Sequence, residues 1–144
     1  MLIGEYTHTI DTKKRVSLPV KFRAVMGKKM IMSRWLDNCI SIYTVDEWKK
    51  VSEELSNLTK TRANHRDYER FITTGAVDVA VDSIGRILIP DFLKDYAKLK
   101  IKVVLAGVNN HIEIWDEKIW KAYKEKIEKQ ADILAERLDE VNVI

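Results

Sequence analysis

The sequence is poor in the residues that build disulfide-stapled, zinc-bound or membrane-spanning proteins. Its 144 residues include one cysteine, two prolines and five glycines. The single cysteine, Cys39, allows no internal disulfide and no cysteine-based zinc site. No apolar run approaches the roughly 20 residues that a helix needs to cross a bilayer. The first residues also lack the basic and long apolar regions of a signal peptide, so we expect a cytoplasmic protein.

Signals of catalysis and of metal or nucleotide binding are equally scarce. The three histidines, His8, His65 and His111, lie far apart and fit no HExxH spacing. No glycine-rich phosphate loop is present, and no local pattern indicates a Ser-His-Asp or Cys-His set. We therefore expect no enzyme activity, no catalytic residue, no cofactor and no metal. Cys39 is expected to be a small packed hydrophobe.

Charge is distributed unevenly along the chain, although the net charge is only +3. Residues 1–72 carry 14 basic side chains against 9 acidic ones, whereas residues 73–144 carry 11 against 13. The first 35 residues hold eight basic and two acidic side chains. A basic half of this kind indicates a polyanionic partner such as nucleic acid. The alternative is a solvated surface with no binding role.

An internal repeat organises the chain. The block Asp11-Thr-Lys-Lys-Arg15-Val-Ser-Leu-Pro19 recurs as Asp82-Ser-Ile-Gly-Arg86-Ile-Leu-Ile-Pro90, with Asp, Arg and Pro at identical relative positions. A second block, Ile40-Ser-Ile-Tyr-Thr44-Val-Asp-Glu-Trp48, recurs as Ile112-Glu-Ile-Trp-Asp116-Glu-Lys-Ile-Trp120. Two blocks in the same order predict two copies of one unit. We divide the chain into repeat 1 (1–56), a linker or helical segment (57–71), and repeat 2 with a C-terminal helix (72–144).

Each repeat is expected to contain a hairpin followed by helices and further strands. Val77, Val79 and Val81 alternate with other residues, which is typical of a strand. A turn at 82–85 and a return strand at 86–89 complete the predicted hairpin. Repeat 1 has the same pattern, with strands at 5–10 and 15–18. Its turn carries Lys14 where repeat 2 carries Gly85, so the two turns are expected to differ in detail.

Helix signals follow both hairpins. Short helices are expected after Pro19 and Pro90, because proline is tolerated in the first turn of a helix. Strands are then expected at 30–34 and 40–43 and at 102–106 and 111–115. The sequence Thr44-Val-Asp-Glu47 has the pattern of a capping box. The final helix carries an apolar stripe from Trp120 to Val141, suited to packing against the body or against another chain.

A unit of about 60 residues is marginal as an independent domain, so two copies sharing one core are the economical architecture. We predict an α+β, β-rich fold of two pseudo-symmetric half-barrel repeats with flanking helices and a long C-terminal helix. The repeated Asp-x-x-x-Arg-apolar-x-apolar-Pro pattern resembles the AbrB/SpoVT swapped-hairpin family. Two copies at this spacing, with Leu2-Ile3-Gly4-Glu5-Tyr6 and the run 112–116, resemble the MraZ family in particular.

This resemblance implies a bacterial transcriptional regulator that acts at the promoter of the division and cell-wall gene cluster. It further implies binding to short repeated boxes in double-stranded DNA, assembly into a homo-oligomeric ring, and a cytoplasmic, nucleoid-associated location. The arginine of the motif is the family's DNA-contacting residue, which corresponds to Arg15 and Arg86.

The residues themselves indicate a basic hairpin tip in repeat 1. The predicted DNA-binding side chains are Lys13, Lys14, Arg15, Lys21, Arg23 and Arg86. Because Arg86 has acidic rather than basic neighbours, repeat 1 is expected to carry most of the phosphate affinity. The alternative for each arginine is an ion pair with the aspartate of its own motif, which is compatible with a DNA contact.

A second function remains open: an antitoxin-like or scaffold oligomer that uses the same fold to bind proteins. The acidic repeat 2 and the long apolar-striped helix favour it. Fold resemblance alone does not separate the two functions.

Overall fold

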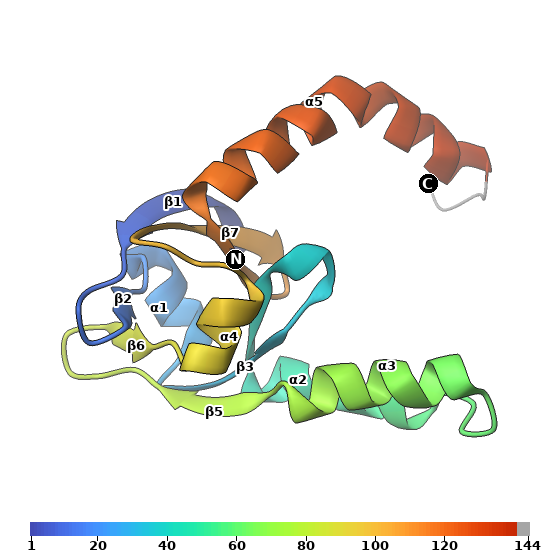
Figure 1. Ribbon diagram of the computed structural model, residues 1–144, viewed down its shortest axis with the longest axis horizontal. Helices are drawn as coiled ribbons and strands as arrows, with labels where there is room; N and C mark the ends of the chain where they lie inside the picture. The colour runs from blue at the N-terminus through green and yellow to red at the C-terminus, as the bar shows by residue number, and fades with distance from the viewer. Residues whose placement is uncertain (141–144) are drawn as a thin grey trace.

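Two copies of one β-rich unit interlock in the structure, a computed structural model that describes residues 1–140 (Figure 1). Repeat 1 contains β1 (Leu2–Thr9), β2 (Arg15–Ser17), α1 (Val20–Met26), β3 (Lys29–Arg34), a short 3-10 helix (Leu36–Asn38), β4 (Ile40–Thr44) and α2 (Val45–Ser56). Helix α3 (Ala63–Thr74) leads to the second copy. Repeat 2 contains β5 (Val77–Ala80), β6 (Arg86–Leu88), α4 (Asp91–Tyr96), β7 (Lys102–Asn109), β8 (Ile112–Asp116) and α5 (Glu117–Glu140).

The sequence repeat corresponds to a pseudo-twofold symmetry in the structure. Six strands form one antiparallel sheet in the order β1-β7-β8-β4-β3-β5, so each half of the sheet mixes strands from both repeats. At its centre Ile40 pairs with Ile114, and Ile42 pairs with Ile112. These four residues are the repeated positions of the second sequence block. The predicted α+β architecture of two pseudo-symmetric repeats is therefore confirmed.

The predicted pairing within each hairpin is wrong. Strand β1 pairs with β7 along its whole length, and β5 pairs with β3. The return strands pair with each other, so β2 and β6 form a separate two-stranded ribbon. Exchange between repeats merges two small cores into one, which buries more apolar surface than either unit buries alone.

One hydrophobic core serves both repeats. Side chains from β2, α1 and β3 lie in the same buried cluster as side chains from β6, α4 and β7. Phe22 of α1 and Leu93 of α4 are fully buried at equivalent places, each three residues after its proline, Pro19 or Pro90. The short helices predicted after the two prolines are present, and each proline lies at the N-cap, one residue before the first turn.

The cap predicted for α2 is present: the Thr44 hydroxyl accepts a hydrogen bond from the Glu47 amide at 3.1 Å. Asp116 does the same for α5, because its carboxylate accepts from the Ile119 amide at 3.3 Å. Helices α2 and α3 lie side by side and project from the sheet, and α5 projects separately (Figure 1).

The apolar stripe of α5 packs against the body only near its start. Trp120 and Tyr123 contact Trp115 of β8, with ring centroids 5.3 and 5.0 Å apart. Residues 125–139 are exposed. Val141, the last residue of the predicted stripe, lies outside the described residues. No helix within residues 1–140 is both long enough and apolar enough to cross a membrane.

Candidate nucleic-acid interface

The two Asp-x-x-x-Arg turns have the same hydrogen-bond pattern. In repeat 1 the Asp11 carboxylate accepts from the backbone amides of Lys13 and Arg15, at 2.8 and 2.9 Å. In repeat 2 the Asp82 carboxylate accepts from the amides of Ile84 and Arg86, at 3.1 and 2.8 Å. An aspartate that bonds the amide two residues later is a local turn-forming device. The repeated aspartate is therefore what closes each turn.

The motif's arginine is held by the same aspartate. Arg15 Nε donates to Asp11 Oδ2 at 2.8 Å, and Arg86 Nε donates to Asp82 Oδ2 at 2.7 Å. The arginine side chains are 29% and 28% exposed. Within residues 1–140 their terminal guanidinium nitrogens donate no hydrogen bond. The aspartate therefore holds one edge of each guanidinium, and the N–H groups at the other edge remain free to donate hydrogen bonds.

The pKa of Asp11 lies below its usual range because the Arg15 backbone amide, and then the Arg15 guanidinium, stabilise the carboxylate. The Arg86 amide and guanidinium lower the pKa of Asp82 in the same way. Both aspartates are therefore ionised near neutral pH, and each carboxylate holds the side chain of its arginine in place.

Lys14 and Gly85 adopt the same backbone conformation, contrary to the expected difference between the turns. Their φ angles are 63° and 85°. Glycine reaches this left-handed region without steric cost, whereas a lysine there is strained. The structure holds Lys14 in place by a cross-repeat bond, because its carbonyl accepts from the Ile89 amide at 2.9 Å. The Gly85 carbonyl accepts from the Leu18 amide at the same distance.

The β2–β6 ribbon brings the two arginines together. Val16 pairs with Ile87 at its centre, and both are buried in the core. Because side chains alternate along a strand, the residues on either side of this pair face outward. Arg15 and Arg86 lie diagonally across the ribbon on that outer face, a relationship that places residues about 7–8 Å apart. We call this surface the ribbon face; it consists of Arg15, Ser17, Arg86 and Leu88.

The remaining predicted cations divide into exposed and engaged side chains. Lys13 and Lys21 are exposed. Lys14 forms an ion pair with Asp91 at the start of α4. Arg23 donates from Nε to the Leu18 carbonyl at 2.9 Å. A Cβ placed on Gly85 would overlap the Arg23 guanidinium, so this arginine covers the turn of the other repeat.

Sequence reasoning placed Arg15 and Arg86 on separate hairpins and so missed that they share one surface. No local pattern within a repeat reveals this, because the pairing of β2 with β6 joins residues of different repeats, far apart in sequence. The resemblance to swapped-hairpin proteins was the one available signal.

Outside the ribbon face, the described part of the chain has few groups suited to metal binding or nucleophilic catalysis. Within residues 1–140 no three His, Cys, Asp or Glu side chains are grouped to hold a metal ion. Cys39 is fully buried, and burial raises the pKa of its thiol, which makes it an unreactive packed residue as predicted.

The family profile and the similar proteins that match this chain all name the same family. The family profile described as "MraZ protein, putative antitoxin-like" matches residues 1–71 and again residues 72–141. The transcriptional regulator MraZ of Caldanaerobacter subterraneus subsp. tengcongensis is 42% identical over 143 residues, which span 99% of this chain and 100% of that protein. Those of Thermoanaerobacter sp. (strain X514) and Natranaerobius thermophilus are 40% and 38% identical over the same spans.

Proposed function

Since this chain belongs to the MraZ family, a family of transcriptional regulators rather than enzymes, we propose that it regulates transcription by binding double-stranded DNA through the ribbon face. The observation that carries the proposal is the placement of Arg15 and Arg86 on one outward surface, each oriented by its own aspartate. A two-stranded ribbon fits the DNA major groove. Arginine presents a planar fork that binds a guanine edge or a phosphate through two hydrogen bonds.

The exposed lysines beside the ribbon extend this surface. Lys13 lies in the first turn and Lys21 in α1, and both side chains are exposed. Cations at these places suit contacts with the phosphates that flank a groove, which supply affinity without reading sequence. Lys14 and Arg23 are bound to protein groups, so we assign them to positioning the turns as well as to adding positive charge.

We propose further that several copies act together, as a homo-oligomeric ring that binds repeated promoter boxes of the division and cell-wall gene cluster in the nucleoid. Residues 125–139 of α5 support association, because they do not pack against the rest of the described chain. Ile127, Leu134 and Leu138 are partly exposed on this part of the helix. Linked ribbon faces would raise avidity through effective concentration, without new contacts in any subunit.

Selection of bound duplexes from a random DNA library tests the proposal directly. We expect enrichment of a short box repeated at a regular spacing, at physiological salt. Recovery of unselected sequences, or no recovery, would contradict sequence-specific binding.

The competing function is a protein-binding oligomer of the antitoxin or scaffold type. The exposed apolar residues of α5 and the acidic composition of repeat 2 favour it. The same selection separates the two functions, because a protein-binding oligomer enriches no DNA sequence.

A further inference from the structure

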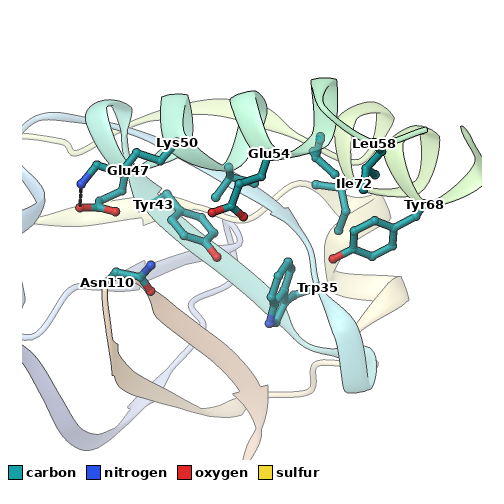
Figure 2. Close-up of a pocket in the computed structure, with 11 residues that line it drawn as sticks. Trp35, Tyr43, Glu47, Lys50, Glu54, Leu58, Tyr68, Ile72 and Asn110 are labelled. Atoms are coloured by element: carbon teal, nitrogen blue, oxygen red, sulfur yellow. Dashed lines mark hydrogen bonds and ion pairs between the residues drawn. The ribbon is translucent and has the colours of Figure 1, made fainter. Parts of the chain in front are cut away.

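A pocket far from the ribbon face lies between the α2–α3 pair and the sheet (Figure 2). Its cavity has a volume of about 260 Å³. Trp35, Tyr43 and Tyr68 supply aromatic surface, and Glu47 and Glu54 of α2 line its upper side. The DNA-binding proposal uses none of these residues. A space of this size suits one side chain or one small molecule rather than a drug-sized ligand.

Polar groups converge in this pocket without partners of their own. Tyr43 is only 3% exposed, yet its hydroxyl makes no hydrogen bond to any residue within 1–140. Figure 2 shows this hydroxyl, the Glu54 carboxylate and the Tyr68 hydroxyl turned toward the space beside Trp35. Because this hydroxyl faces the cavity and has no protein partner, it is available to accept a hydrogen bond from a ligand group.

The charges around the pocket favour a positively charged ligand group. Glu47 is paired with Lys50 at 3.1 Å, whereas Glu54, an exposed residue of α2, has no cationic partner within the described residues. Burial and the charges of Glu113, Tyr68 and Glu54 raise the pKa of Tyr43 to about 12. Burial and the Glu54 carboxylate also raise the pKa of Tyr68. An unpaired carboxylate beside aromatic faces attracts a cation through both charge and the ring quadrupoles.

We propose that this pocket binds an alkylguanidinium or alkylammonium group, held by the Glu54 carboxylate and the Tyr43 hydroxyl and packed against Trp35. The N–H groups of such a cation can donate hydrogen bonds to the Glu54 carboxylate and to the Tyr43 hydroxyl oxygen. Its alkyl chain can pack against the apolar side chains of Leu55 and Ile72, which line the pocket. The cation comes either from a free small molecule or from a basic side chain of a second copy of the chain.

Titration with propylguanidinium tests the chemistry, with the indole N–H resonance of Trp35 as the readout. We expect a saturable shift for the wild-type protein and none for N-propylurea, a neutral molecule of similar shape. Glu54→Gln should weaken binding about tenfold, because it removes the charge while keeping the shape. Tyr43→Phe should weaken binding by less and leave the fold intact, since its hydroxyl has no protein partner. The matched control is Glu53→Gln, an exposed neighbour that does not line the pocket.

Sedimentation of the same samples distinguishes the two sources. If a second copy supplies the cation, propylguanidinium and Glu54→Gln both convert the oligomer to smaller species, and Glu53→Gln does not. If the cation is a free molecule, the oligomer is unchanged and the indole titration saturates. Wild-type protein that shows neither a saturable shift nor a change in sedimentation overturns the proposal. Equal binding of N-propylurea, or equal behaviour of Glu54→Gln and Glu53→Gln, also overturns it.

Discussion

The first and second turns share a backbone and differ in the side chains that surround it. Asp11 and Asp82 make the same set of hydrogen bonds, and both arginines are almost equally exposed. Around this shared frame, the first turn carries Lys13 where the second carries Ile84. The comparison suggests two separate roles: the aspartate–arginine pair builds the turn in both repeats, and we propose that the added lysines set how strongly each turn attracts a polyanion.

Removal of the lysines near the first turn should have the largest effect on DNA affinity. We expect Lys13→Ala with Lys21→Ala to weaken binding to every sequence and to flatten the log–log salt dependence by about 1 for each lysine, as lost phosphate contacts do. Fluorescence anisotropy over a range of salt concentrations measures both quantities.

Lys118→Ala with Lys121→Ala in α5 is the matched control for that experiment, because it removes two exposed cations from repeat 2. A loss for this control equal to that of the first double variant would contradict the assignment of phosphate affinity to repeat 1.

Gly85→Ala should destabilise the second turn. Alanine at a φ of 85° costs about 1–2 kcal/mol, and its Cβ would displace the Arg23 guanidinium from its place over the turn. We expect the free energy of unfolding, measured with urea, to fall by at least this amount. An unchanged midpoint would show that the left-handed turn is not required for folding.

Lys14→Gly is the reverse experiment at the first turn, and its effect should be smaller. Glycine relieves the strain of the left-handed conformation, but the ion pair with Asp91, worth about 0–1 kcal/mol at an exposed site, is lost. We expect a gain of less than about 1 kcal/mol in the same assay. A loss as large as that of Gly85→Ala would mean that the two turns do not share one backbone requirement.

The smallest effect should come from acid titration of the two aspartates. Their pKa values are lower in the folded chain than in the unfolded one, so they contribute stability above about pH 4, and this is lost as the pH falls through the folded pKa. Asp11→Asn and Asp82→Asn should each flatten the dependence of Tm on pH in this acid range, by similar amounts. A Tm profile that keeps its wild-type acid slope in both variants would contradict the role of the aspartates.

Local features of the fold were predictable because local chemistry causes them. The alternation of Val77 and Val79 indicates a strand, and the cap formed by Thr44 begins α2 as expected. Strand partners were not predictable in this way, since they depend on residues far apart in sequence. The ribbon face depends on the pairing of β2 with β6, which no local pattern within one repeat indicates.

The pocket beside Trp35 was likewise not predictable from local sequence patterns. Its residues come from both repeats and from α3, a segment the sequence suggested only as a linker or helix. Only two of its lining residues, Tyr43 and Glu47, belong to the repeated sequence blocks.

The salt dependence of DNA binding by an Arg15→Ala, Arg86→Ala double variant tests the ribbon face most directly. Lysine at both positions is the control, because it keeps the charge and loses the planar fork. For each subunit on the DNA, we expect the alanine variant to lower the log–log slope by about 1.8, which is about 0.9 for each lost phosphate contact. The lysine variant should keep the slope and lose preference among DNA sequences. A folded alanine variant with wild-type affinity and slope would contradict the account.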